Sequence, residues 1–284
     1  MSRPRVFLPA CFVAVLLCAH AANVSAQSIW MPQPDAPFVR LEWYKANYDL
    51  ANDITFLTSV WFLTGAIKVA PTIAVVAEVP FSYYNEEPSS GTFEAESAFG
   101  NPYVAVLVGS TGTVGVGEFG IRLPMVTDDN FSALVNGWMT DFSRWEAFLP
   151  DILTVRARGG ANLPAASGAI SIRLLVGANL LVPTEGGGDS ELMADADAGI
   201  WYRPVNFTVG AVLSGKTLLS ESDLSLKERS EAQLSLAALA QFGSFEPGVS
   251  LRLPLFNDGL AGLGDLVSAV YGLNLTVHLG PEDK

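Results

Sequence analysis

Charged side chains that alternate with small or apolar ones are the feature of this sequence with the clearest chemical meaning. Asp195 and Asp197 are two positions apart within residues 191–202, and Arg156 and Arg158 are also two positions apart. Side chains of a β-strand point alternately to two faces, so each such segment predicts a strand with one polar and one apolar face. Chemistry carried by these residues would therefore lie on one side of a sheet.

Two motif matches within this alternation suggest ligand binding. Residues 210–217 fit the phosphate-binding loop pattern G-x-x-x-x-G-K-[ST], but that loop must join a strand to a helix. Here the match lies inside the alternating segment 205–216, which favours a chance match within a strand. Asp195 and Asp197 resemble part of a calcium-binding loop that lacks its other acidic ligands. The sequence therefore predicts no nucleotide site, no metal site and no cofactor.

Catalytic residues are sparse. His278 is the only histidine after residue 26, and acyl hydrolases with a serine nucleophile rely on a histidine beside it. No serine motif accompanies His278, and no cluster of histidines and carboxylates has the spacing of metal ligands. The prediction is that the protein is not an enzyme.

Residues 1–26 have the features of a signal peptide. Arg3 and Arg5 precede an apolar run over 6–19, and Ala26 ends a Val-Ser-Ala tripeptide of the kind that a signal peptidase recognises. The alternative is an uncleaved membrane anchor, for which the apolar run is short. Cleavage before Gln27 would leave one domain, residues 27–284. It would contain no cysteine, because both cysteines, Cys11 and Cys18, precede the cleavage site.

The composition separates a membrane barrel from a soluble sheet protein. Half of the residues are hydrophobic and the mean hydropathy is +0.33, yet no apolar stretch beyond residue 26 is long enough to span a bilayer as a helix. Hydrophobicity spread over every second residue suits a closed barrel that faces lipid. The chain has 16 basic and 29 acidic residues, a balance that disfavours nucleic acid as a partner.

The segments predict an all-β fold, a transmembrane antiparallel β-barrel of about twelve strands. A slip of the alternation near Gly117 predicts a bulge. Long and short links alternate, which predicts an even strand number with both termini on the periplasmic side, the brief link between the first two strands being the exception. The strands are expected over 37–48, 54–65, 72–84, 101–109, 113–124, 151–163, 168–183, 191–202, 205–216, 232–242, 245–255 and 266–279.

The longest link, residues 125–148, predicts a short helix. Its apolar residues Leu134, Trp138, Phe142 and Trp145 recur at helical spacing behind Asn130, a candidate N-cap. Two interpretations are open. The helix either folds into or over the pore, or packs on the barrel rim with its tryptophans at the membrane interface, and the second is favoured.

Short motifs resemble a known family. An apolar residue followed by proline ends the segments 78–84, 119–124, 178–183 and 249–254, and residues 100–124 combine Gly-Asn, two strands and a Leu-Pro end. This layout is similar to the transporter-like outer-membrane family named for the meta-pathway of phenol degradation. The resemblance implies passive uptake of small apolar or aromatic solutes, location in the bacterial outer membrane among its lipids, and assembly by the barrel-assembly machinery.

The sequence departs from barrels that end in phenylalanine, because Leu279 is followed by five further residues. That tail leaves the assembly signal open.

The polar face predicts the lining of a pore, because charges are costly against lipid and tolerated against water. The expected pore-lining residues are Arg40, Glu42, Glu78, Glu118, Arg122, Arg156, Arg158, Arg173, Asp195, Asp197, Lys216 and Arg252. Two interpretations remain open: the opposite charges create a transverse field that orients solutes, or they pair and plug a narrow barrel. The predicted function is passive passage of small solutes. The alternative is a non-conducting structural or adhesive barrel whose acidic loops bind divalent cations or a surface partner.

Overall fold

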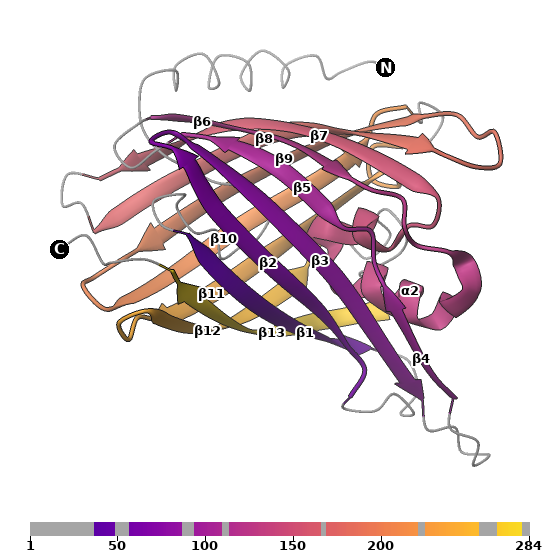
Figure 1. Ribbon diagram of the computed structural model, residues 1–284, viewed down its shortest axis with the longest axis horizontal. Coiled ribbons are helices and arrows are strands. Elements are labelled where there is room, and N and C mark those ends of the chain that lie inside the picture. Colours follow the sequence, from indigo (N-terminus) through magenta and orange to yellow (C-terminus); the bar gives the residue numbers. More distant parts are fainter. Residues whose placement is uncertain are drawn as a thin grey trace, which may run out of the picture.

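The computed structural model describes residues 37–48, 57–86, 94–109, 114–165, 169–220, 225–255 and 266–279. They form a closed antiparallel β-barrel with one α-helix and two short 3-10 helices (Figure 1). The predicted signal peptide, with Cys11 and Cys18, lies outside the described residues, so its cleavage remains a prediction.

Thirteen strand segments build the wall. They are β1 (Phe38–Tyr48), β2 (Ser59–Ala70), β3 (Ile73–Glu86), β4 (Glu94–Phe99), β5 (Tyr103–Val108), β6 (Gly115–Arg122), β7 (Ile152–Pro164), β8 (Ile170–Pro183), β9 (Glu191–Tyr202), β10 (Phe207–Leu218), β11 (Ser230–Ala240), β12 (Phe245–Pro254) and β13 (Val267–His278).

The segments β4 and β5 are two halves of one crossing. Both pair with β3: Phe81 lies opposite Phe99 of β4, and Ile73 lies opposite Val108 of β5. Residues 100–102 interrupt the ladder between them. The wall therefore crosses twelve times, as the sequence predicts.

Pairing of the first strand with the last closes the barrel. Leu41 of β1 lies opposite Leu275 of β13 on one side and Leu63 of β2 on the other. Because the number of crossings is even, Pro37 and Leu279 lie at the same end. We call this the turn end, since five short connections join strands there, and we call the opposite end the loop end.

Three expectations about the first half of the chain are wrong. The second strand begins at Ser59 and not at residue 54, so the link before it is long and the single exception to the parity disappears. Residues 94–99, which lie between the expected strands 72–84 and 101–109, form β4. Strand β6 pairs without a register shift on both sides, so there is no bulge beside Gly117: Val116 faces inward as an apolar residue.

The outer face of the wall is apolar. Leu63, Val106, Phe119, Ile200 and Leu273 are all at least 41% exposed, and the residues next to them in each strand point inward. An exposed belt of this kind is costly in water and suits hydrocarbon. No helix among the described residues is long and apolar enough to cross a membrane.

Glycines on the inner face make room for large side chains. A Cβ atom on Gly210 would lie 2.3 Å from the ring of Trp201, and one on Gly120 would fall on the ring of Tyr103. The interior is thus filled by bulky residues that pack over small ones, as in narrow barrels.

Candidate functional site

The candidate site is the barrel interior, where the predicted polar residues gather. Eleven of the twelve predicted pore-lining residues are buried, and Asp197 is half-buried. Their neighbours along each strand are exposed or half-buried, so the polar face of each strand points inward at these positions. That these residues line an open pore remains a prediction.

The link between β6 and β7 enters the barrel at the loop end. It contains η1 (Asp128–Asn130), α2 (Phe131–Thr140) and η2 (Phe142–Phe148), and Figure 1 shows α2 at one end of the barrel. Leu134, Phe142 and Phe148 of this inserted loop are buried in one cluster with Tyr44 and Phe62 of the wall.

This placement corrects the expectation of a helix on the rim. Trp138 and Trp145 stack on one another at 5.9 Å, and Trp138 packs against the same buried cluster. The apolar face of α2 meets the inner wall because the wall offers aromatic rings there. The expected helix therefore exists, but it folds into the barrel.

Asn101 holds the base of the inserted loop. Its Oδ1 accepts hydrogen bonds from the backbone of Met125 (2.7 Å) and Val126 (2.9 Å), and its Nδ2 donates to the carbonyl of Leu149 (2.7 Å). Both ends of the loop are thus bound to one fully buried side chain. Gly100 beside it is required by space, because a Cβ there would lie 2.5 Å from the carbonyl oxygen of Ala147.

A first group of ion pairs centres on Arg144 of the loop. Its guanidinium contacts the carboxylates of Glu42 (2.8 Å) and Glu78 (2.7 Å) on the wall and of Asp141 (2.7 Å) on the loop. Asp141 also forms an ion pair with Arg252 of β12 at 2.6 Å. Arg144 lies 3.4 Å over the ring of Phe62, which adds a cation–π contact.

A second group centres on Glu146 of the loop. Its carboxylate contacts Arg156 of β7 at 3.1 Å and Lys216 of β10 at 2.8 Å. Arg156 in turn reaches Asp195 of β9 at 2.6 Å.

The pairs continue along the wall. Arg158 contacts Asp195 at 2.9 Å and also pairs with Asp197, and Arg122 contacts Glu78 at 2.9 Å. Of the two interpretations of the inner charges, the structure shows the paired one. Asp195 and Asp197, which resemble a calcium-loop fragment, are partners of arginines.

The surroundings of the loop carboxylates Asp141 and Glu146 favour their ionised forms. Burial by itself raises the pKa of the Asp141 carboxyl, but Arg144 and Arg252 outweigh this effect and hold that pKa at about 2. For Glu146, burial is likewise outweighed by Lys216 and Arg156, so its pKa is lowered. Both carboxylates are therefore ionised at neutral pH, as their ion pairs require.

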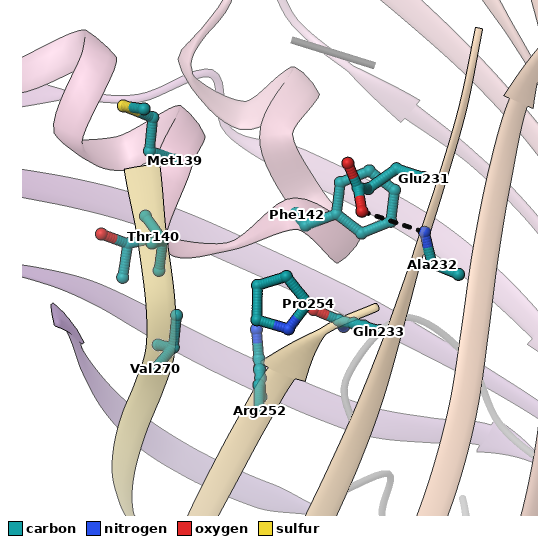
Figure 2. A pocket seen from close by; sticks show the side chains of 10 residues that line it. Met139, Thr140, Phe142, Glu231, Ala232, Gln233, Arg252, Pro254 and Val270 are labelled. Atoms are coloured by element: carbon teal, nitrogen blue, oxygen red, sulfur yellow. Dashed lines mark hydrogen bonds between the residues drawn. The ribbon is translucent and has the colours of Figure 1, made fainter. Parts of the chain in front are cut away.

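The joint between the loop and the wall is tight. Figure 2 shows Phe142 of the loop beside Glu231 of the wall, and Met139, Thr140 and Arg252 complete this part of the lining of a cavity of about 10 Å³. A single water molecule needs about this volume, so the cavity has room for little more than one water. The Nε2 of Gln233 also donates to the hydroxyl of Ser143 at 2.7 Å across the joint.

Asp141, Arg144 and Glu146 were absent from the residues predicted from the alternation, because they lie outside any strand. A signal for them existed: Asp141 and Arg144 are three positions apart within an otherwise apolar stretch, the spacing at which opposite charges can pair on one helical turn. Asn101 was part of the Gly-Asn pattern, but the alternation says nothing about what an asparagine at a break in a strand would bind.

The phosphate-loop match and His278 lie in ordinary structural positions. Residues 210–217 lie within β10 with no helix after them, so the phosphate-loop match is a strand. His278 lies at the turn end, where Glu246 approaches its Nε2 to 3.9 Å and no hydrogen-bond partner of that atom is present among the described residues.

Comparisons with known proteins identify the fold. No protein-family model and no curated protein matches the sequence, so the resemblance to the phenol meta-pathway family remains a prediction. Among solved structures, a KdgM porin aligns with a TM-score of 0.50 and 10% identity over 86% of this chain and 99% of that chain. A NanC porin aligns with a TM-score of 0.50 and 9% identity, over 86% of this chain and 100% of that chain. The fold of the chain is that of a bacterial outer-membrane β-barrel, with twelve antiparallel crossings.

Proposed function

We propose that the protein is an outer-membrane channel for passive passage of small solutes, and that the inserted loop closes the channel in this conformation. The observation that carries the proposal is the charged wall behind the loop. Arg156, Lys216 and Arg252 project from three strands toward loop carboxylates. When the loop leaves, these side chains would border water.

A barrel with only a structural role would not need charged side chains on this part of its inner wall. Replacing buried ion pairs by well-packed apolar residues of similar volume is often neutral or stabilising, so buried pairs are weak evidence for stability. Ionic side chains are, however, suited to a surface that is hydrated in one state and paired in another. The loop itself supplies three charged residues, Asp141, Arg144 and Glu146, and is joined to the wall by non-covalent contacts.

The solutes are proposed to be small, with an apolar or aromatic part. The family resemblance supports this, and so does the inner wall near the turn end. There Trp201, Val212, Ala237 and Leu239 form an apolar cluster inside the barrel. The outer belt is proposed to contact outer-membrane lipid, and assembly is proposed to use the barrel-assembly machinery. No catalytic role is proposed.

The alternative is a non-conducting structural or adhesive barrel. It is supported by the tight joint between loop and wall and by the pairing of the inner charges. The two functions differ in their response to removal of the ion pairs: a channel opens, whereas a structural barrel loses stability without gaining a pore.

Conductance of the refolded protein in planar bilayers tests the proposal. The variant Asp141→Asn/Arg144→Met/Glu146→Gln removes the three loop charges with little change of volume, and we expect larger or more frequent conductance steps than in the wild type. Asp189→Asn/Glu185→Gln, at exposed positions of the link between β8 and β9, is the matched control and should behave as the wild type.

Heat-modifiable migration and circular dichroism establish that each variant is folded. A folded loop variant without steps above background would contradict the channel and favour the structural barrel.

A further inference from the structure

Near the turn end, the inner wall contains a buried arginine without a carboxylate partner in the described part of the chain, unlike the arginines near the loop end. Arg173 of β8 is 8% exposed, and its side chain forms no ion pair or hydrogen bond with any described residue. Its guanidinium lies over the ring of Trp201 at 4.8 Å. In the loop-end network, by contrast, Arg122, Arg144 and Arg156 each contact a carboxylate.

A second polar group without a partner lies beside Arg173. Asn162 of β7 is directly opposite Arg173 in the ladder, is 7% exposed, and its buried Oδ1 has no partner among the described residues. Buried polar groups are nearly always bonded, and leaving one unpaired costs about 1–3 kcal/mol. Two such groups on neighbouring strands leave hydrogen-bonding capacity for a ligand.

The surroundings of this pair are apolar. Gly199 of β9 lies opposite Arg173 on the other side, and a Cβ on Gly199 would lie 3.0 Å from Val212 and 3.2 Å from the indole nitrogen of Trp201. These two residues belong to the cluster that includes Leu239 of β11. The wall from β7 to β11 thus offers one cation, one amide and an adjacent apolar surface.

Resting on the proposed channel function, we propose that this wall binds small aromatic carboxylates. Arg173 would donate two parallel hydrogen bonds to the carboxylate, as guanidinium groups do with planar anions. The Oδ1 of Asn162 is an acceptor, so only the Nδ2 of that amide would donate a further one. Trp201, Val212 and Leu239 would contact the aromatic body. Other charged groups at this end are Arg203, which is exposed in the connection between β9 and β10, and Arg40 of β1, which donates to Thr276. Glu246 and His278 approach each other on another part of the wall.

Calorimetric titration of the refolded, full-length mature barrel in detergent micelles tests the site. The probes are benzoate, its neutral isostere benzamide, acetate and inorganic phosphate, each corrected for partition into empty micelles. Benzoate should bind about tenfold or more tightly than the other three, because benzamide lacks the charge and acetate and phosphate lack the ring.

Variants then assign the contacts. Arg173→Gln should weaken benzoate binding about tenfold or more, and Trp201→Leu should weaken it while leaving acetate unaffected. Arg173→Lys keeps the positive charge and should retain part of the affinity, which provides a second variant if Arg173→Gln does not fold. Lys68→Gln, which removes an exposed cation of β2 near the same end, is the control and should bind as the wild type.

Benzoate binding that is unchanged in folded Arg173→Gln would overturn the assignment, and so would equal affinity for phosphate or acetate. Conduction and binding separate the two proposals. A protein that conducts but does not bind benzoate contradicts this site and leaves the channel standing. A protein that binds benzoate but conducts in no variant contradicts the channel and supports the site.

Discussion

Lys216 bonds Glu146 of the inserted loop at 2.8 Å, although Glu231 lies directly opposite Lys216 in the ladder between β10 and β11. Glu231 is 2% exposed, accepts one hydrogen bond from the backbone of Ala232, and has its Oε2 buried without a partner among the described residues. Glu146 of the loop thus pairs with Lys216, although Glu231 of the wall is placed to pair with the same ammonium group. Displacement of the loop would leave Lys216 beside Glu231, so the wall contains a replacement partner for the open state.

Glu146→Gln should release the loop. The change leaves Lys216 and Arg156 without the carboxylate that faces both, and removing one partner of a buried ion pair costs about 3–5 kcal/mol. We expect faster protease cleavage within 126–148 and higher conductance. Glu185→Gln, which is exposed at the same end, is the control. Loop cleavage at the wild-type rate in folded Glu146→Gln would show that this pair does not hold the loop.

Asn101→Leu should loosen the base of the loop. The four hydrogen bonds between the Asn101 side chain and both ends of the loop are lost and backbone groups are left unsatisfied, each at a cost of about 1–3 kcal/mol. Urea unfolding in lipid vesicles should show a lower free energy of unfolding. Asn47→Leu, which removes an exposed hydrogen bond to Ser268, should change that energy little. Similar losses in both variants would argue against a special role for Asn101.

Closure of the channel should resist moderate acid. The folded-state pKa of Asp141 is about 2, below its ordinary value of 3.8. Because the folded pKa is the lower one, the stabilisation from its ion pairs is fully present above pH 3.8 and is lost as the pH falls through about 2. Bilayer conductance should therefore stay constant between about pH 7 and about pH 4.5 and rise only at lower pH. A rise that begins near neutral pH would show that another group controls closure.

Leu273→Arg should destabilise the barrel in lipid. Leu273 is 52% exposed on the outer face of β13, and an arginine at the bilayer midplane costs about 2–4 kcal/mol. Val205→Arg, in the exposed connection between β9 and β10, places the same side chain near the membrane edge, where the cost is about 0–1 kcal/mol. Unfolding in vesicles measures both. Equal losses would remove the assignment of the outer face.

Orientation in the membrane is indicated by the lengths of the connections. Long links gather at the loop end and short ones at the turn end, a distribution typical of barrels whose long links face outward. A protease-cleavable tag inserted at Gly187 of the loop end should be cut on intact cells, whereas one inserted at Gly243 of the turn end should be cut only after the outer membrane is opened. Cleavage of the Gly243 tag on intact cells would reverse the orientation.

The amino-acid sequence by itself determined the wall of the barrel. Strand β9 covers residues 191–202 as predicted, and the polar-face residues from Arg40 to Arg252 are buried or half-buried, because the period of two assigns each side chain to a face wherever the alternation is regular. The errors fall where that rule is weak. An inward valine at position 116 imitates a bulge, and the polar residues 94–99 form a strand only because β3 extends beside them.

Tertiary structure alone decided where the inserted loop lies and which charges pair. Helical spacing over 131–148 specifies an apolar face but not what covers it, since the rim and the inner wall offer similar surfaces. Arg144 contacts Glu42 and Glu78, which precede it in the sequence by 102 and 66 positions. Contacts at such separations depend on barrel closure, which brings β1 and β3 to the same side of the loop, and no local pattern in the sequence encodes that distance.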